Sequence, residues 1–553
     1  MSASYKLLAF AIAAALSGTA TAAVGSNDPA AGRALTLIKL NTVPTRTSTG
    51  DAFIARDVVI DTKTGTEHVR FDRTYNGLRV LGGDLVVHSR AGTFKGASVT
   101  LPAPLSVPTA AKISTTAAIS TANAQFGLVT TSAPTAQLLV YARNTTPKLA
   151  YDVLLVGKRK DQTPTRMHYI VDANTGAVLS RWDDVHTGTV PASGTPTYTP
   201  AVGSGKSLMS GTVPLNTAFN GRLFEMKDMT RGGTWTMDYA NTFRDETAVK
   251  LLDANNQWGN GARSDRATIA VDATWGIATT WDYFKNVHGR LGVNNDGAGT
   301  MNAVHYQQGY NNAFWLDSCA PLSPNGCMVF GDGDGVDWNP VVMLDVTGHE
   351  MSHGVTWRTA GLIYSGASGG LNEATSDIFG TMVEFYANNP NNPPNYMIGE
   401  KLAISNPDGT LALRYMFKPS LDGISPDCYP ANDPREGYED FFNNWMDPHF
   451  NSGVANHFFY LLAEGAVVPA GFAGAPYNLT PASLVCNGNT ALVKIGRQAA
   501  QQIWYRALTV YMTSGTNYQG ARAATLSAAT DLYGAGSAQY NAVAAAWSAV
   551  SVN

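Results

Sequence analysis

Two histidines and a glutamate lie in the order His349-Glu350-Met351-Ser352-His353, a spacing that suits zinc chemistry. On a helix, residues four positions apart share one face, so both imidazoles can bind the same cation. Glu350 lies between them and can act on a water molecule held by that ion. The alternative interpretation of these five residues is a surface helix that carries two histidines by chance.

Glu373 and Asp377 argue against chance, because they again lie four residues apart on a second predicted helix. One carboxylate can complete a zinc site, and the other can orient a ligand imidazole through a hydrogen bond. The pattern therefore predicts that His349, His353 and Glu373 bind zinc. Three protein ligands leave one coordination position open, which indicates catalysis.

The chain resembles the thermolysin-like neutral metalloproteases, the family that includes vibriolysin and pseudolysin. The resemblance covers nearly the whole sequence, and the order and spacing of its motifs agree throughout. The matching stretches are YNNAFW (310–315), MVFGDGDG (328–335), DVTGHEMSHGVT (345–356), TAGLIYSGASGGLNEATSDIFG (359–380), ALRYM (412–416) and HFNSG (449–453). The resemblance implies a secreted zinc endopeptidase, made as a self-processed zymogen, in which Glu350 assists the attack of water held by zinc.

Further catalytic residues follow from the same resemblance. Glu350 is expected to take a proton and to deliver it to the leaving amine. Tyr364 and His449 match the family positions that stabilise the developing oxyanion. Asp447 is expected to orient His449, at the spacing of pseudolysin-type members, whereas the spacing of thermolysin itself would select Asn444. The residues expected to orient the zinc-binding imidazoles are Asp377 and Asn372.

Substrate contacts are also implied. The Asn312 side chain, the Ala313 main chain and the Arg414 guanidinium match groups that hold the substrate backbone, and a guanidinium can hold a carbonyl with two donors. Val346 and Leu413 match the walls of a hydrophobic pocket. The pocket implies cleavage on the amino side of bulky apolar residues in protein or peptide substrates.

Calcium is the second cofactor that the resemblance implies. Asp345, Glu384 and Glu400 match carboxylates that bind calcium in the family, and hard oxygen ligands suit this ion. Asn395 stands where an aspartate is usual, and Met397 stands where thermolysin has an acid. We therefore expect one structural calcium ion and no bridged pair. The tract GDGDG (331–335) lacks the spacing and the terminal glutamate of an EF-hand, so we interpret it as a turn.

The N-terminus carries the features of a secretory signal, which we place at residues 1–23. Lys6 precedes the apolar run from Leu7 to Leu16, and the small residues Ala20-Thr21-Ala22 follow. This run is shorter than the roughly 20 residues that a membrane-spanning helix needs, and no other segment is apolar enough. We expect an exported, soluble protein without a membrane span. Charged residues make up 14% of the chain and the net charge is -4, which argues against nucleic acid as a partner.

Residues 24–190 read as an α+β propeptide of two modules, about 24–110 and 111–190. Alternating apolar runs such as 58–60 and 85–87 predict strands, and turn signals occur at Asn76-Gly77 and at 174–176. The stretches at 70–88, 149–156 and 169–184 resemble propeptide modules of the family, which assist folding and inhibit the protease. The Pro- and Thr-rich segment 191–203 reads as the processing linker.

The catalytic part is expected to have an α+β fold with two lobes. A β-rich lobe spans 204–340 and contains one helix at 273–287, and a helical lobe spans 341–553. The zinc cleft should lie between the lobes. The helices expected in the second lobe cover 341–361, 370–388, 491–512 and the Ala-rich tail.

Four cysteines in an exported chain are expected to be paired. Cys319 and Cys327 can close a short loop, which would leave Cys428 and Cys486 as the second pair, but sequence leaves all three connectivities open. Two other classes of function compete with an endopeptidase: a zinc aminopeptidase, and an exported binding protein that keeps the fold without catalysis. The presence of Glu350, Tyr364 and His449 argues against the latter.

Overall fold

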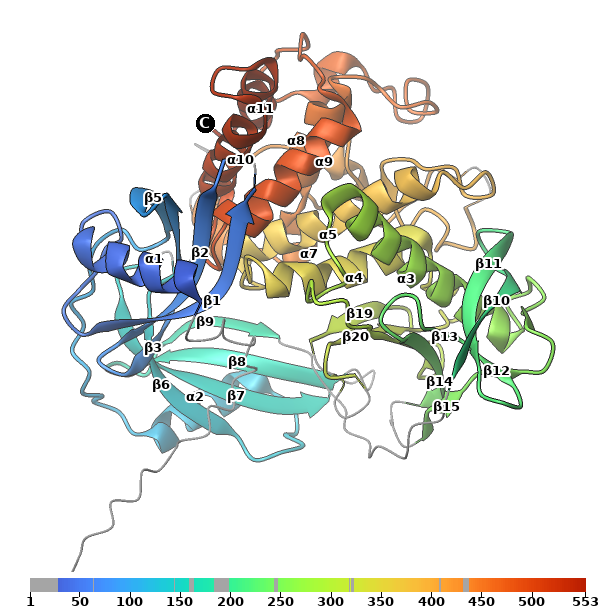
Figure 1. The fold of residues 1–553 in the computed structure, drawn as a ribbon, viewed down its shortest axis with the longest axis horizontal. Coiled ribbons are helices and arrows are strands. Elements are labelled where there is room, and N and C mark those ends of the chain that lie inside the picture. Colours follow the sequence, from blue (N-terminus) through green and yellow to red (C-terminus); the bar gives the residue numbers. More distant parts are fainter. Residues whose placement is uncertain are drawn as a thin grey trace, which may run out of the picture.

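The computed structural model describes residues 28–62, 64–143, 145–158, 164–183, 198–242, 247–317, 319, 323–406, 409–430 and 437–553. The expected signal peptide lies outside these residues, and so does the expected linker up to residue 197. The remainder of that segment belongs largely to strand β10, which begins at Thr199. In Figure 1, helices α3 to α5 lie between the green strands and the orange to red C-terminal helices, and the blue to cyan N-terminal region lies alongside.

The N-terminal region forms one continuous sheet that runs through both expected propeptide modules. Its strand order is β5-β4-β2-β3-β6-β7-β8-β9, and β1 pairs with β2. The modules join where β3 pairs in parallel with β6, with Val80 opposite Val140. The elements are α1 (Pro29–Leu40), β1 (Asp51–Asp61), β2 (Thr66–Tyr75), β3 (Leu78–Leu81), β4 (Leu85–Arg90), β5 (Thr93–Val99), α2 (Thr115–Phe126), β6 (Thr135–Tyr141), β7 (Lys148–Lys158), β8 (Pro164–Asp172) and β9 (Val178–Asp183).

The predicted turn at Asn76-Gly77 joins β2 to β3. Both residues have positive φ angles, 48° and 81°, as a two-residue hairpin turn requires. Glycine adopts such angles without steric cost, and asparagine tolerates them better than most residues. The local sequence therefore explains this connection completely.

The β-rich region after residue 198 forms two sheets. The first has the order β16-β12-β11-β10-β17, and the second has the order β13-β14-β18-β20-β19 with β15 beside β14. Strand β19 is thus an edge strand. The strands are β10 (Thr199–Lys206), β11 (Thr212–Phe219), β12 (Phe224–Glu225), β13 (Lys227–Asp228), β14 (Thr234–Thr242), β15 (Val249–Lys250), β16 (Leu252–Asp253), β17 (Gln257–Trp258), β18 (Met301–Tyr306), β19 (Ala313–Leu316) and β20 (Cys327–Phe330).

Several predicted helix boundaries were wrong. Helix α5 (Gly366–Ala387) begins four residues before its expected start. Helix α3 (Arg266–His288) begins seven residues before the expected start, because Asp265 caps it by accepting a hydrogen bond from the Thr268 amide. Helix α4 (Leu344–Arg358) begins late because Met343 is extended, and Gly361 lies in the turn beyond its end with a φ of 63°. In the expected helix 491–512, the first five residues are not helical.

The C-terminal region is mainly helical, as predicted. A large apolar cluster fills it, and within that cluster Phe458 stacks on Trp547 with ring centroids 3.8 Å apart. Its elements are α5 (Gly366–Ala387), β21 (Met397–Ile398), β22 (Arg414–Tyr415), η2 (Pro419–Asp422), α6 (Tyr438–Asn444), α7 (Pro448–Asn451), α8 (Gly453–Glu464), η3 (Pro481–Leu484), α9 (Gly496–Arg506), the π-helical turn η4 (Ala507–Tyr511), α10 (Tyr518–Tyr533) and α11 (Ala538–Ala549).

Cys319 is bonded to Cys327, and Cys428 is bonded to Cys486, so the structure selects one of the three possible connectivities. Within the described part of the chain, no helix combines the length and apolar character needed to cross a bilayer. The mixed architecture, β-rich and then helical, confirms the predicted fold class.

Candidate active site

Helices α4 and α5 bring the three predicted zinc ligands together. Nε2 of His349 lies 3.0 Å from Nε2 of His353. The two carboxylate oxygens of Glu373 each lie 3.4 Å from one of these nitrogens. One potential ligand atom from each residue therefore falls within 4.8 Å of the others, a spacing that one metal ion can bridge.

Glycines allow the two helices to approach so closely. A Cβ atom on Gly380 would lie 2.4 Å from the main-chain oxygen of Asp345, and one on Gly348 would lie 2.9 Å from Cα of Gly380. Real side chains do not tolerate such contacts. The small residues at this crossing thus set the helix separation at which His349 and Glu373 converge.

Hydrogen bonds determine which nitrogen of each imidazole faces the site. Asp377 Oδ1 accepts from Nδ1 of His349 at 2.8 Å, and Asn372 Oδ1 accepts from Nδ1 of His353 at 2.8 Å. Because these oxygens only accept, both rings carry their proton on Nδ1 and present an Nε2 lone pair. Two lone pairs and a buried carboxylate at one point repel each other unless a cation lies between them. Zn²⁺ fits this set of donors.

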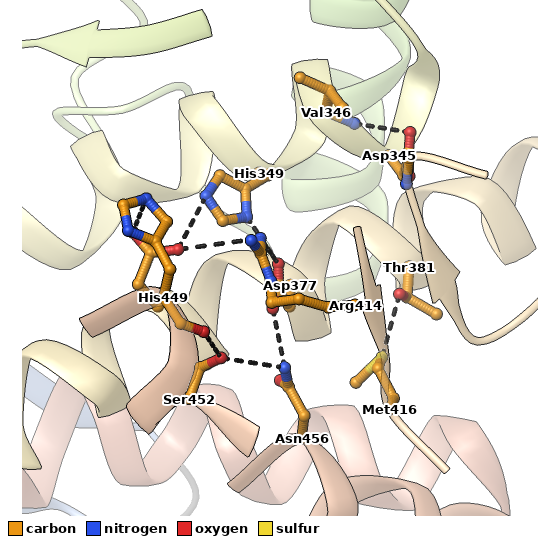
Figure 2. Close-up of polar contacts among 12 residues, drawn as sticks. Asp345, Val346, His349, Asp377, Thr381, Arg414, Met416, His449, Ser452 and Asn456 are labelled. Carbon is orange, nitrogen blue, oxygen red and sulfur yellow. Dashed lines mark hydrogen bonds and ion pairs between the residues drawn. The ribbon is translucent and has the colours of Figure 1, made fainter. Parts of the chain in front are cut away.

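Asp377 is held from three sides. Besides His349, Arg414 donates to it from Nε at 2.7 Å and from Nη2 at 2.6 Å, and Asn456 Nδ2 donates to Oδ2 at 2.7 Å (Figure 2). Sequence reasoning missed Asn456. It lies on α8, whereas His449 lies on the separate short helix α7, so no helical spacing in the sequence connects the two.

Glu350 is buried beside the zinc ligands on α4, with 6% of its surface exposed. Burial raises the pKa of Glu350 above its ordinary value, although the neighbouring His349 and His353 oppose this shift. A carboxylate in such surroundings accepts a proton more readily than one in water. Its position suits a group that takes up a proton and passes it on.

Tyr364, His449 and Asp447 form a connected group beside Glu373, and Tyr364 and His449 approach the same carboxylate oxygen, Oε1, as His353. The Tyr364 hydroxyl donates to Oε1 of Glu373 and lies 3.2 Å from Nε2 of His449. Asp447 Oδ1 accepts from Nδ1 of His449 at 2.8 Å, while the Asn444 side chain donates to Asp440. The two-residue spacing therefore identifies the carboxylate that contacts the histidine.

A cavity of about 230 Å³ opens beside these groups. Leu413, Arg414 and Asn312 line it, although Nε and Nη2 of Arg414 donate to Asp377, and Ala313 begins edge strand β19. Val346 does not line it, although it belongs to the same buried cluster as the lining residues Val341 and Leu402. The complete lining is Asn311, Asn312, Trp338, Val341, Leu402, Leu413, Arg414, His449 and Phe450. Sequence reasoning missed Trp338, Val341 and Leu402, whose apolar type is shared with the whole core.

The three predicted calcium ligands are also buried near one another. Burial and then Glu400 raise the pKa of Asp345 to about 7, and burial and then Asp345 hold the pKa of Glu384 well above its ordinary value. Oε2 of Glu384 has no hydrogen-bond partner among the described residues. Such mutually repelling carboxylates suit a hard cation by their chemistry, but in the described part of the chain their oxygens do not converge as those of the zinc ligands do. Asn395, which stands where an aspartate is usual, donates from Nδ2 to Glu400 at 3.0 Å. It therefore contributes a neutral amide and no negative charge to this site.

Family models match most of the chain. The model described as the thermolysin metallopeptidase catalytic domain matches residues 202–357, and the model of its alpha-helical domain matches residues 360–552. The fungalysin/thermolysin propeptide motif matches residues 51–101. The two catalytic models meet at the end of α4, just after the zinc-binding histidines.

Individual relatives agree with these models. The transglutaminase-activating metalloprotease of Streptomyces mobaraensis is 42% identical over 510 residues, which are 91% of this chain but 61% of that protein. A thermolysin of Alicyclobacillus acidocaldarius is 35% identical over 505 residues, covering 88% of this chain and 83% of that protein. A bacillolysin of Bacillus cereus is 36% identical over 537 residues, covering 92% and 86%.

Proposed function

The chain belongs to the thermolysin family of zinc metalloendopeptidases, and from this premise we propose that it is an exported protease made as a self-processed zymogen. The observation that carries the proposal is the convergence of His349, His353 and Glu373, with Glu350 beside them. In this family, zinc is the catalytic cofactor and calcium is also used.

Bound zinc would polarise the scissile carbonyl and make a water molecule acidic enough to attack it near neutral pH. Glu350 accepts the proton of the attacking water and delivers it to the amine that leaves. Its burial supports both steps, because a raised pKa brings the carboxyl closer to the acidity of its proton partners. Asp377 and Asn372 keep the two imidazoles in the orientation that metal binding requires.

Tyr364 and His449 stabilise the negative charge that develops on the carbonyl oxygen. Both groups lie next to Glu373, and Asp447 holds the ring of His449 by a hydrogen bond at 2.8 Å. Donors that are already in place when charge develops stabilise the transition state more than the bound substrate. This arrangement supports acyl transfer to water.

The substrate would bind as an added strand along β19, whose edge position leaves main-chain groups available. Asn312 lies immediately before this strand and at the cavity. The apolar walls Val341, Leu402 and Leu413 suit a bulky hydrophobic side chain on the amine side of the cut bond.

The N-terminal sheet serves as folding assistant and inhibitor in this proposal. It reaches the catalytic part through Arg143, which donates to Ser365 O and Ser368 Oγ at the start of α5. A second contact joins Asp84 to the Ser514 amide at 3.0 Å. Cleavage within the expected linker 191–203 would separate the two parts, and the N-terminal leader 1–23 would direct export.

Expression of the full chain with Glu350→Gln tests these steps together. We expect the variant to bind zinc, to lose casein cleavage and to retain its propeptide. Glu464→Gln, at the end of α8, is the matched control and should process itself and cleave casein. Mass spectrometry and N-terminal sequencing of the secreted product should place the mature start between His186 and Gly211. A fully processed, active Glu350→Gln protein would contradict the proposal.

A further inference from the structure

Asn456 on α8 connects two parts of the active site that are distant in sequence (Figure 2). Its Nδ2 donates to Asp377 Oδ2 at 2.7 Å and lies 3.4 Å from Oγ of Ser452. That hydroxyl in turn donates to the main-chain oxygen of His449 at 2.7 Å. One buried amide thus links the carboxylate behind a zinc ligand to the segment that carries His449.

The two oxygens of Asp377 have different partners. Oδ1 accepts hydrogen bonds from His349 Nδ1 and Arg414 Nη2. Oδ2 accepts hydrogen bonds from Arg414 Nε and Asn456 Nδ2. With Arg414 alone on Oδ2, the carboxylate and guanidinium can tilt together as one planar unit. The amide of Asn456 comes from another helix and fixes the plane of the carboxylate, and with it the direction of the bond to His349.

The stability of the fold does not explain why residue 456 is polar. The residue is 1% exposed, and its Oδ1 has no hydrogen-bond partner among the described residues. A buried unpaired oxygen costs free energy, so an apolar side chain would suit the core better. We propose, on the basis of the proposed function, that Asn456 is a positioning residue that keeps His349 aligned for zinc.

Asn456→Leu removes the donor at nearly constant size, and Asn302→Leu is its matched control. Asn302 lies on β18, is fully buried and also has an unpaired Oδ1, but its amide donates to Thr236 and Ala273. Zinc release to a chelator is measured in the full chain carrying Glu350→Gln, so that self-digestion does not interfere. The catalytic constants are measured with Glu350 present.

We expect Asn456→Leu to release zinc about tenfold faster or more and to lower kcat with KM nearly unchanged. Asn302→Leu should lower the melting temperature while keeping the parent rate of zinc release. The proposal is overturned if both variants release zinc at the parent rate, or if both accelerate release equally. Should Asn456→Leu fail to fold, Asn456→Ser, too short to reach Asp377, gives the same comparison. A parent protein that binds no zinc would instead refute the proposed function.

A second inference comes from a different place, the contact between the N-terminal sheet and the C-terminal helices. His68 on β2 lies opposite His88 on β4, and both rings are almost fully buried. Their Nδ1 atoms are 2.7 Å apart, and both rings pack on Tyr511 of η4, with centroids 6.0 and 5.1 Å away. Removal of the propeptide would separate both rings from Tyr511, and His68 from Arg506.

For two neutral rings, the contacts select one arrangement of protons. Arg506 Nη2 lies 3.2 Å from Nε2 of His68, and a guanidinium only donates, so this Nε2 is unprotonated. A neutral His68 then carries its proton on Nδ1 and donates it to Nδ1 of His88. His88 therefore carries its proton on Nε2 and donates to Oγ of Ser98 at 2.9 Å. An additional proton on either ring would place two N–H groups against each other.

Charged groups around the pair also oppose protonation. Burial and Arg506 lower the pKa of His68 to about 4, against the attraction of Asp61. Burial and His68, together with Arg70 and Arg506, lower the pKa of His88 to about 3, against the attraction of Asp531. Asp61 and Asp531 also form ion pairs with Arg506, at 3.4 and 2.9 Å, and the guanidinium offsets much of their negative charge.

We propose that this histidine pair makes the hold of the propeptide depend on pH: the contact is firm while both rings are neutral and loosens in acid. The inference rests on the proposed inhibitory role of the propeptide. The contact lowers the pKa of both histidines. The affinity of the propeptide for the catalytic part is therefore greatest above the ordinary histidine pKa of about 6.5. It falls as the pH drops from there toward about 4, by at most about tenfold per pH unit for each ring.

The test uses the self-processed wild-type protein, purified with its propeptide. Samples are incubated at a series of pH values from about 7 to about 4 and returned to neutral pH. Peptide hydrolysis and co-elution of the propeptide are then measured. In the double variant His68→Gln, His88→Gln, each side chain keeps a donor group and an acceptor group. Neither amide takes up a proton in this pH range. His168→Gln, on β8 of the same sheet, is the matched control.

We expect wild type and His168→Gln to lose the propeptide and gain activity after acid incubation, and the double variant to keep it to a pH about one unit lower. Release of all three at the same pH would overturn the proposal. If the double variant does not accumulate, His68→Gln alone should show a smaller shift in the same direction. Full activity with the propeptide still bound at neutral pH would instead refute the inhibitory role of the propeptide. Co-elution would still measure how its binding depends on pH.

Discussion

The phenol oxygen of Tyr364 lies 3.2 Å from Nε2 of His449, although 85 residues separate them in the chain. Both groups face Glu373, and Asp447 holds the histidine ring from the other side. Two elements, the turn before α5 and helix α7, are thus brought together at the zinc site. The contribution of the two side chains can therefore be tested with single and double variants.

Tyr364→Phe should lower kcat by about 10²- to 10³-fold with KM and zinc content nearly unchanged, because the lost hydroxyl acts on the transition state. Steady-state kinetics on a short peptide and metal analysis measure this. His449→Gln should have a similar effect, and the double variant should lose less than the product of the two. Fully multiplicative losses would show that the groups act independently.

Asp377→Asn should weaken zinc binding by about 10- to 100-fold, because the carboxylate that orients His349 loses its charge and part of its bonding to Arg414. Competition with a chelator measures the affinity. Asp447→Asn serves as the control, since Asp447 contacts His449 and no zinc ligand. It should lower kcat while zinc affinity stays at the parent value. Equal zinc affinity in Asp377→Asn and wild type would contradict this role.

Calcium should stabilise the protein more strongly as the pH rises. The pKa of Asp345 is raised to about 7, so the ion-free fold loses stability as the pH rises from about 4 through about 7 and this carboxyl ionises. Glu384, whose pKa is also raised, adds to the loss because the two carboxylates repel each other. Calcium offsets that repulsion. The rise in melting temperature on adding calcium should be at least about 2–4 °C larger at about pH 8 than at about pH 5.

Glu384→Gln is the control for this effect. It removes one charge from the site and should reduce the pH dependence of the calcium response. A calcium response that is the same at both pH values in the wild-type protein would argue against a buried carboxylate site.

Leu413→Trp should change substrate preference by narrowing the cavity of about 230 Å³. Cleavage before leucine or phenylalanine should fall about tenfold relative to cleavage before alanine, measured as the ratio of kcat/KM values on matched peptides. Leu411→Trp, two residues away and outside the cavity lining, should keep the original preference. An unchanged ratio in Leu413→Trp would show that this cavity does not select the substrate side chain.

Local spacing made several features predictable. The pairs His349 and His353, and Glu373 and Asp377, lie at helical intervals, and helices α4 and α5 contain them as expected. The turn at Asn76-Gly77 was likewise readable, because backbone preference decides it. Helix limits were less predictable, since the cap at Asp265 and the extended Met343 depend on single residues.

The cavity lining could be predicted only in part. Leu413 was expected there, but Trp338, Val341 and Leu402 are ordinary apolar residues in the sequence, and only packing places them around the cavity. Val346 matched a pocket wall, and it packs in the same buried cluster as Val341 and Leu402 without lining the cavity.

By itself, the sequence determined which side chains can bind zinc, because residues four apart share a helix face whatever surrounds the helix. Tertiary structure decided what lies behind and around them. It chose the partners of the cysteines, brought Asn456 to Asp377 across 79 residues and set His68 against Arg506 across 438. Such contacts depend on how distant segments pack, and no short-range periodicity encodes that packing.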